Sequence, residues 1–128
     1  MSQFLRFCVV GTIGFFVDAG VLQALVFGAG LNPYAARVAS FLAAASITWW
    51  LNRHYTFDVA HAPTRREWAR YVSLMVLGAL TNYGAYALAI SVWDLARTHL
   101  WIGVAIGSIA GLGVNYTTSR AFVFAARR

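Results

Sequence analysis

The chain has no lysine, only four acidic residues and a single cysteine among its 128 residues. A lone cysteine, Cys8, excludes an internal disulfide, and no metal-ligand spacing surrounds it, so we interpret it as a small apolar helix residue. The three histidines (His54, His61 and His99) are scattered and form no ligand set, and no nucleophile–base arrangement occurs. We therefore expect no metal, no cofactor and no enzymatic activity.

Charged residues make up only 11% of the chain, whereas hydrophobic residues make up 60%. An ordinary soluble protein has about 25% charged residues. A water-soluble fold of this length has too little interior to bury so much apolar surface. The composition therefore predicts a protein that lies in a lipid bilayer.

Four apolar runs approach the roughly 20 residues that a helix needs to cross the hydrocarbon core. They cover about 7–27, 34–51, 71–93 and 100–118. The second run is the least apolar, because Arg37 interrupts its start. The first run is too long for the apolar region of a signal peptide and lacks a cleavage site, so we expect a retained helix. The predicted fold class is an all-α integral membrane protein with four transmembrane helices.

The positive charge comes from arginine alone and is unevenly distributed between the chain segments that flank the runs. If the N-terminus is cytoplasmic, only Arg37 and Arg97 fall on the outer side of the membrane. This bias predicts a multi-pass protein of the inner (cytoplasmic) membrane with both termini in the cytoplasm. Arginines that flank apolar runs favour this role over nucleic-acid binding, and we expect no nucleic-acid partner. The arginines on the predicted cytoplasmic side are Arg6, Arg53, Arg65, Arg66, Arg70, Arg120, Arg127 and Arg128.

An internal repeat relates the two halves of the chain. An aromatic-x-Arg-aromatic motif opens each half, and the ends of the second and fourth runs also align. We predict one transmembrane domain over 1–128, with repeat one at 4–57, a polar linker at 58–67 and repeat two at 68–124. Both repeats enter the membrane from the same side and are therefore parallel. The matched positions are Phe4-x-Arg6-Phe7 with Trp68-x-Arg70-Tyr71, Gly14 with Gly78, Asp18 with Asn82, Thr48 with Asn115, Asn52 with Ser119, Arg53 with Arg120 and Phe57 with Phe124.

Asp18 lies about 16 Å into the first run, close to the middle of the membrane, and Asn82 has the same depth in repeat two. A carboxylate at this depth costs about 2.5–3.5 kcal/mol on insertion scales, so it needs a cavity or a partner. Two interpretations remain open. Asp18 belongs to a polar site that binds a proton, a sugar hydroxyl or a cation, or it forms a structural hydrogen bond or an ion pair with Arg37. The small residues nearby predict close helix packing: Gly11, Gly14, Gly78, Gly103, Gly107 and Gly111.

Four arginines recur at equivalent places near the predicted cytoplasmic ends of the helices: Arg6, Arg53, Arg70 and Arg120. Guanidinium groups bind phosphate oxygens bidentately, so this set is a candidate site for a lipid phosphate. The alternative is that these arginines only mark topology and extend to the headgroups. The candidate polar or sugar-binding residues are Asp18, Asn82, Arg37, Thr48, Asn52, Asn115 and Ser119.

These motifs resemble those of the GtrA-like family of small four-helix membrane proteins, and the resemblance covers nearly the whole chain. Thr48 stands where the family often has asparagine, although Asn115 keeps that residue in the second half. The motifs that carry the resemblance are Phe4-x-Arg6-Phe7, Val10-Gly11-x-x-Gly14 with Asp18, Leu51-Asn52-Arg53-x-x-x-Phe57 and Asn115-Tyr116-x-x-Ser119-Arg120-x-x-x-Phe124.

The resemblance implies translocation of a polyprenyl-phosphate-linked sugar from the cytoplasmic to the outer leaflet for the synthesis of cell-surface glycans. The partners would be this lipid-linked sugar and the membrane lipids. Four helices enclose little volume, so we also expect a homo-oligomer, most simply a dimer. One alternative is a membrane anchor that recruits a polyprenyl-phosphate glycosyltransferase. Another is a small proton-coupled multidrug-type exporter with an acid in its first helix, although the strong charge bias argues against the dual topology of that group.

Overall fold

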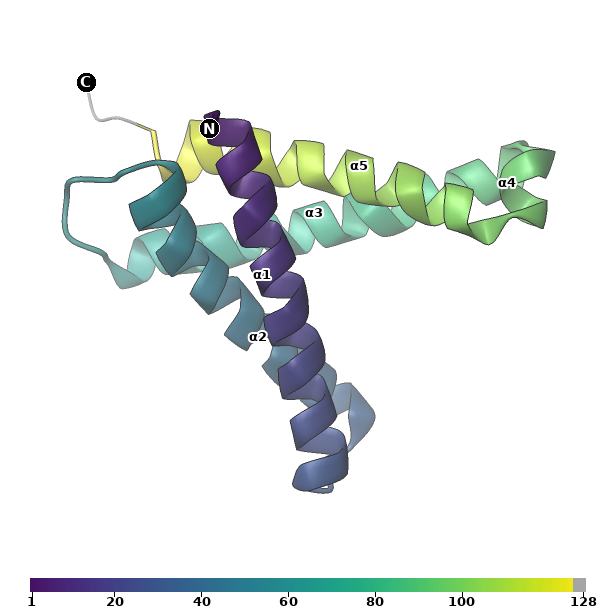
Figure 1. Cartoon of the computed structure of the whole chain (residues 1–128), viewed down its shortest axis with the longest axis horizontal. Coiled ribbons are helices and arrows are strands. Elements are labelled where there is room, and N and C mark those ends of the chain that lie inside the picture. Colours follow the sequence, from purple (N-terminus) through teal and green to yellow (C-terminus); the bar gives the residue numbers. More distant parts are fainter. Residues whose placement is uncertain (126–128) are drawn as a thin grey trace. The chain divides into compact units, whose positions relative to one another are not determined.

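The computed structural model describes residues 1–125, and all regular elements in this range are helical, which confirms the predicted all-α class (Figure 1). Arg127 and Arg128, which the orientation prediction includes, lie outside the described residues. The long helices are α1 (Gln3–Gln23), α2 (Pro33–Leu51), α3 (Arg65–Val92) and α5 (Leu100–Thr118), and the short helix α4 (Asp94–Thr98) precedes α5. Three π-helical turns extend α1, α2 and α5: η1 (Ala24–Gly28), η2 (Asn52–Thr56) and η3 (Ser119–Val123).

Three helical segments within the described range are long and apolar enough to cross a membrane: Gln3–Gly28, Arg65–Val92 and Leu100–Val123. The chain is therefore a multi-pass membrane protein. Helix α2 does not belong to this group. It includes Arg37 and does not meet the same criterion of length and apolar composition. The fourth crossing, and with it the four-span topology, stays a prediction.

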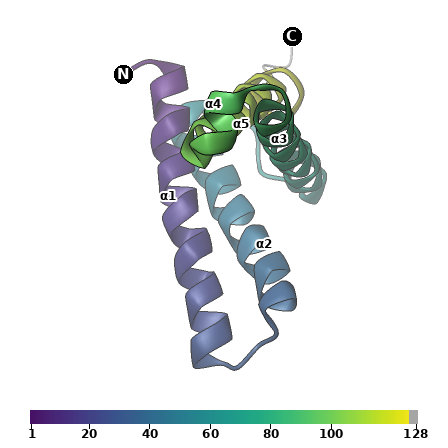
Figure 2. The ribbon, with the colours of Figure 1, turned by 90° about the vertical axis from the view of Figure 1, so that its right-hand side faces the viewer.

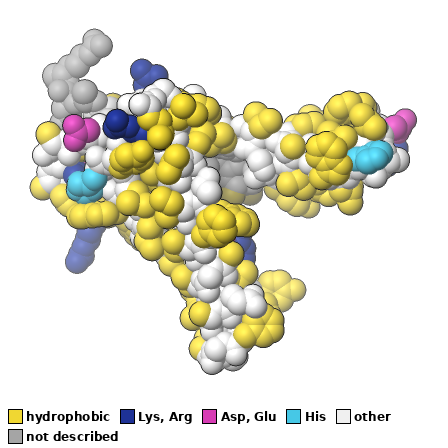
Figure 3. Space-filling view, in the orientation of Figure 1, with side chains coloured by type: hydrophobic (Ala, Val, Ile, Leu, Met, Phe, Trp, Pro, Cys, Tyr) yellow, Lys and Arg dark blue, Asp and Glu magenta, His cyan; other side chains and the backbone are white. Residues whose placement is uncertain are grey.

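Large apolar side chains lie on the outside of the helices. In Figure 3 hydrophobic side chains cover much of the visible surface along the helices. Only 11% of the most apolar stretch of α1 is buried, and the same fraction applies to α3. Phe15, Phe16 and Leu80 are each about two-thirds exposed. Burying such side chains is what drives folding in water, so this outward distribution requires an apolar solvent.

The chain divides into two compact units, which we call unit 1 (Met1–Val72) and unit 2 (from Ser73 onwards). Unit 1 contains the hairpin of α1 and α2, whose helices lie side by side and are joined by a short turn (Figure 2). Gly30 adopts a φ of 68° in this turn, a conformation that glycine accepts without strain. Asn32 then caps α2, because its Oδ1 accepts a hydrogen bond of 2.8 Å from the Tyr34 N–H.

Gly14 allows α2 to approach α1 closely. A Cβ placed on Gly14 would lie 2.5 Å from Thr48 Cγ2, so any larger residue would push the two helices apart. This confirms the predicted role of Gly14 in close helix packing. Gly11 is exposed and has no atom of the hairpin within 4 Å of such a Cβ, so its role in close packing stays a prediction.

Unit 2 contains the hairpin of α3 and α5, which run alongside each other in Figure 1. The three glycines of α5 face α3: Gly103 lies against Tyr86 and Ile90, and Gly107 and Gly111 lie against Asn82. A Cβ on Gly107 would lie only 2.5 Å from the backbone oxygen of Asn82. The glycine stripe of α5 therefore serves packing inside the chain, which the sequence alone could not distinguish from packing between subunits.

Arg97, on the short helix α4, closes the C-terminal end of α3. Its Nε donates to the carbonyl of Ile90 (3.0 Å), and its Nη2 donates to the carbonyl of Ser91 (2.9 Å). These are among the last carbonyls of α3, which have no partner inside the helix. A cation at this end also compensates the helix dipole.

Helix α3 begins earlier than the apolar run predicts. Thr64 caps it, because Thr64 Oγ1 accepts a hydrogen bond of 3.1 Å from the Glu67 N–H. The predicted polar linker over 58–67 therefore ends at Thr64, and Arg65, Arg66 and Glu67 form the first turn of α3. The first residues of α3 belong to unit 1, so the compact units divide at Val72 rather than at the predicted start of repeat two.

Candidate functional site

Asp18 and Arg37 form an ion pair between α1 and α2. The Nη1 of Arg37 lies 2.5 Å from Asp18 Oδ1 and 2.6 Å from Oδ2. The carboxylate is largely covered, with 23% of its side chain exposed, whereas the Arg37 side chain is 56% exposed. Ser40 also lies within reach of the guanidinium, at 3.4 Å. Arg37 therefore supplies the intramembrane partner that a carboxylate at this depth needs.

Three of the four acidic residues pair with an arginine: Asp18 with Arg37, Glu67 with Arg53, and Asp94 with Arg97. Two of these arginines, Arg37 and Arg97, are the ones predicted on the outer side of the membrane. Both of their charges are thus compensated locally.

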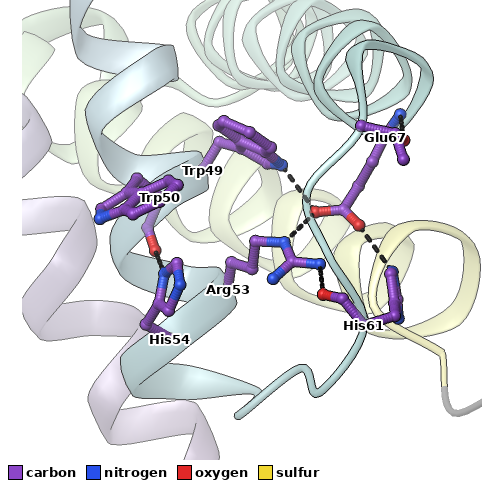
Figure 4. A network of polar contacts seen from close by, with 7 residues as sticks. Trp49, Trp50, Arg53, His54, His61 and Glu67 are labelled. Atoms are coloured by element: carbon purple, nitrogen blue, oxygen red, sulfur yellow. Dashed lines mark hydrogen bonds and ion pairs between the residues drawn. The ribbon is translucent and has the colours of Figure 1, made fainter.

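Arg53 lies at the centre of a buried polar cluster formed with Trp49, His61 and Glu67 (Figure 4). The Arg53 Nε donates to Glu67 Oε1 at 2.8 Å, and Arg53 Nη2 donates to the carbonyl of His61. Glu67 Oε1 also accepts from the Trp49 Nε1–H at 2.9 Å, and Glu67 Oε2 lies 2.9 Å from His61 Nε2. The side chains of Arg53 and Glu67 are only 2% and 6% exposed. This cluster joins the end of α2, the segment that follows it and the first turn of α3.

The sequence predicts Arg53 as a phosphate ligand beyond the end of the second helix, but the structure places it differently. The helix continues through η2, so Arg53 lies within the helical segment and is almost fully buried. Its charge is already paired with Glu67. An external phosphate would have to displace this carboxylate, so Arg53 is suited to holding the fold rather than to binding a ligand.

The other three predicted phosphate ligands are more accessible. Arg6 is partly exposed, donates from Nη1 to the carbonyl of Tyr55 (3.2 Å) and places its guanidinium 5.2 Å from the centre of the Tyr55 ring. The buried Nε of Arg6 has no hydrogen-bond partner among the described residues. Arg70 on α3 and Arg120 on η3 are exposed. These three arginines can reach an anion without breaking a buried ion pair.

A buried chain of hydrogen bonds connects Thr48 and Asn52 in unit 1. The Tyr71 hydroxyl donates to Thr48 Oγ1 (2.9 Å) and accepts from Asn52 Nδ2 (3.0 Å). The Thr56 hydroxyl then donates to Asn52 Oδ1 (2.8 Å), and the Thr48 hydroxyl donates to the carbonyl of Ala45 (3.1 Å). All of these side-chain oxygens have a partner inside the protein, so this chain has a structural role.

The matching positions of unit 2, Asn115 and Ser119, are arranged differently. Asn115 Oδ1 and Ser119 Oγ are both buried, and neither has a hydrogen-bond partner within residues 1–125. Ser119 is completely buried. Asn115 points at Gly78 of α3, since a Cβ on Gly78 would lie 2.5 Å from Asn115 Cγ. Asn82 lies farther along the same helix pair, with its Oδ1 2.6 Å from the place of a Cβ on Gly107.

Sequence analysis missed the partners that complete these clusters: Glu67, His61, Trp49 and Tyr71. One signal was present, because Thr64-x-x-Glu67 has the spacing of a helix-capping motif and places Glu67 in the first turn of a helix. Glu67 is also the only acidic residue between Asp58 and Asp94. The pairing with Arg53, fourteen residues earlier, depends on the path of the linker, which the sequence pattern does not define.

The fold and these clusters define an all-helical, multi-pass membrane protein with paired charges between its helices and arginines near its helix ends. The family model described as "GtrA/DPMS, transmembrane domain" matches residues 6–128 of the chain. The chain therefore belongs to the GtrA/DPMS transmembrane-domain family, which confirms the resemblance drawn from its motifs. The match also points to the handling of polyprenyl-phosphate-linked sugars.

Proposed function

We propose that this protein translocates a polyprenyl-phosphate-linked sugar from the cytoplasmic to the outer leaflet of the inner membrane, for the synthesis of cell-surface glycans. The observation that carries the proposal is the match to the GtrA/DPMS family over nearly the whole chain. A translocator must offer polar groups within a membrane-spanning structure, because a sugar loses its hydrogen bonds with water when it enters the bilayer. The polar side chains of both helix pairs are suited to this task.

In this proposal Arg6 and Arg70 of unit 1, and Arg120 of unit 2, each offer a guanidinium to a lipid phosphate near the cytoplasmic surface. They are more exposed than Arg53, and a guanidinium matches the geometry of phosphate oxygens. Arg53 instead fixes the end of α2 to the start of α3 through Glu67. The proposal includes both termini in the cytoplasm, where arginines near the helix ends would meet the phosphate headgroups.

The Asp18–Arg37 pair provides a charge-neutral polar position between α1 and α2. A hydroxyl of the passing sugar would hydrogen-bond with the outer edge of this pair, where Arg37 is about half exposed. The pair also reduces the support for a proton-coupled exporter, since both carboxylate oxygens of Asp18 already contact a guanidinium. Asn82 has a neutral amide at the matching position of unit 2.

A membrane anchor for a polyprenyl-phosphate glycosyltransferase is the second candidate function. The segment between η2 and α3 favours it, because His61 ties this polar segment to Arg53 and Glu67. A fixed polar segment at the membrane surface offers a partner a defined binding face. Purified protein that binds the transferase, but moves no lipid in its absence, would support this function over translocation.

We also propose that the protein acts as a homodimer, because a chain of this size encloses little volume. The glycine stripe of α5 is occupied by α3 within the chain and so does not supply the dimer contact. Measurement of the molecular mass in lipid nanodiscs tests this proposal. A monomer that is fully active would contradict it.

The translocation proposal is tested with purified protein in liposomes that contain a polyprenyl-phosphate-linked hexose in one leaflet. The fraction of sugar that becomes accessible to a membrane-impermeant periodate reagent is followed over time. We expect faster exposure of the sugar than in protein-free liposomes, with no transferase present. Equal rates in the two preparations would contradict translocation.

A further inference from the structure

Two buried oxygen atoms of unit 2 lack the hydrogen bonds that buried polar groups normally have. They are the Oδ1 of Asn115 and the Oγ of Ser119, and neither has a partner within the described part of the chain. Ser119 has no exposed surface at all. The large majority of buried polar side-chain atoms in folded proteins are hydrogen-bonded, so two such atoms one helical turn apart require an explanation.

The matching positions of unit 1 show how this gap arises. There the hydroxyl of Tyr71 bonds with both Thr48 and Asn52, and the hydroxyl of Thr56 donates to the remaining oxygen of Asn52. Tyr71 belongs to the aromatic-x-Arg-aromatic motif, whose first copy has Phe7 at the same place. Phenylalanine has no hydroxyl. One copy of the motif therefore has a hydroxyl that can hydrogen-bond with neighbouring polar side chains, and the other copy has none.

The side chain of Asn115 packs closely against α3 at a position where α3 has no side chain of its own. Gly78 lies opposite the amide, and Asn115 Cγ occupies the space next to it that a larger residue would fill. Ser119 marks the start of the π-helical turn η3, in which the Phe124 N–H donates to the Ser119 carbonyl at 2.9 Å. Asn52 begins the equivalent turn η2 in unit 1, so the two matched positions share this backbone conformation and differ in their hydrogen bonds.

The chemistry of the two atoms selects the ligand. An amide oxygen only accepts hydrogen bonds, and a serine oxygen accepts as well as donates. A phosphate at neutral pH offers mainly acceptors and cannot satisfy Asn115 Oδ1. A sugar hydroxyl donates and accepts, so adjacent hydroxyls of one sugar ring can satisfy both atoms together. A dehydrated cation is the competing ligand, since it also binds oxygen atoms.

We infer that Asn115 and Ser119 form a hydroxyl-recognition subsite for the sugar headgroup, and that unit 2 provides it while the matching residues of unit 1 serve only structure. The inference rests on the proposed function for the origin of the sugar. It adds that the two copies of the repeat have different roles, which the repeat alone does not imply. The carrier phosphate is contacted elsewhere, so the subsite discriminates lipid carriers with a sugar from carriers without one.

The test compares binding of two probes to the full-length protein in nanodiscs: a polyprenyl-phosphate-linked hexose and the same polyprenyl phosphate without sugar. The variants are Ser119→Ala and Asn115→Leu. Thr117→Ala is the matched control, because Thr117 is exposed on α5 and its hydroxyl bonds to the Gly113 carbonyl. The affinity for each probe and the melting temperature without ligand are measured for every protein.

We expect the wild type and Thr117→Ala to prefer the sugar-bearing lipid. Each subsite variant loses about three- to tenfold of this preference, as expected for one neutral hydrogen bond, with unchanged affinity for the sugar-free carrier. Ser119→Ala melts at the same temperature as the wild type or higher, because it removes a buried polar atom that has no partner. A purely structural role for Ser119 predicts the opposite, a lower melting temperature.

Three results would overturn the subsite. In the first, both variants keep the full preference of the wild type for the sugar-bearing lipid. In the second, the wild type itself shows no such preference. In the third, sodium stabilises the wild type in the absence of sugar, and the variants lose this stabilisation. This experiment can refute the subsite without refuting the proposed function, and the reverse is also true. Sugar preference that depends on Asn115 and Ser119 without lipid movement would refute translocation alone, whereas movement with unaffected variants would refute the subsite alone.

Discussion

The buried ion pair of Arg53 and Glu67 leads to a quantitative prediction about stability. Replacing Glu67 with glutamine leaves the Arg53 guanidinium uncompensated in an environment where its side chain is 2% exposed. Removal of one partner from a buried pair typically costs about 3–5 kcal/mol. The neighbouring bonds to Trp49 and His61 also lose a charged acceptor. For a chain of this size the loss corresponds to a decrease in melting temperature of roughly 10 °C or more.

The assay is thermal unfolding in a single detergent, followed by circular dichroism at 222 nm. Asp94→Asn is the matched control, because it breaks the Arg97–Asp94 pair, whose acidic side chain is 92% exposed. Surface pairs contribute little, so the control should melt close to the wild type. The double variant Arg53→Met/Glu67→Met should recover much of the loss, since it leaves no unpaired buried charge. If Glu67→Gln melts like Asp94→Asn, the cluster does not stabilise the junction of α2 and α3.

Two further substitutions test the helix contacts of each unit. Gly78→Ala should destabilise the protein by about 1–3 kcal/mol, because its Cβ would lie 2.5 Å from Asn115 Cγ. Gly113→Ala is the control, because no atom lies within 4 Å of its Cβ, and its stability should be equal to that of the wild type or slightly higher. Equal melting temperatures of the two would contradict the close packing. Asp18→Asn should cost roughly 1 kcal/mol, a value reduced because the Arg37 side chain is about half exposed. The charge-neutral Asp18→Asn/Arg37→Gln should be the more stable of the two, and a lower stability of this double variant would argue against the ion pair.

The helices of this protein can be predicted from its sequence, because apolar runs and helix caps are local features of the chain. The apolar run over 7–27 exceeds the length needed to cross a bilayer, and the structure extends it only slightly, to Gln3–Gly28. Helix α5 has the predicted bounds, and Asn32 with Pro33 marks the start of α2. The short helix α4 escaped prediction, since five residues are too few to show a periodic pattern.

The partners of the polar residues were harder to predict, because they depend on how distant segments meet. The Asp18–Arg37 pair is one of two interpretations that the sequence leaves open, because both residues lie within neighbouring apolar runs. The pairing of Arg53 with Glu67 cannot be predicted from the sequence pattern, because it depends on the path of the intervening loop. The pairing matters for the site, because a buried arginine whose charge is already compensated is less suited to binding a phosphate.

The unequal hydrogen bonding of the two units also lay beyond the sequence. The repeat predicts the same role for Thr48 and Asn115, and for Asn52 and Ser119. In the structure the hydroxyls of Tyr71 and Thr56 satisfy the first pair of matched residues, whereas Asn115 Oδ1 and Ser119 Oγ have no partner within the described residues. Two neighbouring hydroxyls thus distinguish the hydrogen bonding of the two matched pairs.

The most direct test of the account measures sugar translocation by the purified wild type and by Arg6→Gln/Arg120→Gln in liposomes that contain no glycosyltransferase. Neither arginine belongs to the Arg53–Glu67 cluster, but Arg6→Gln also removes the contacts of Arg6 with Tyr55, so the melting temperature of the variant is measured beside its transport rate. We expect the wild type to expose the lipid-linked sugar faster than protein-free liposomes, and the variant to do so at least about tenfold more slowly, because charge-assisted contacts to phosphate are lost. Sugar exposure by the wild type no faster than in protein-free liposomes would contradict the account.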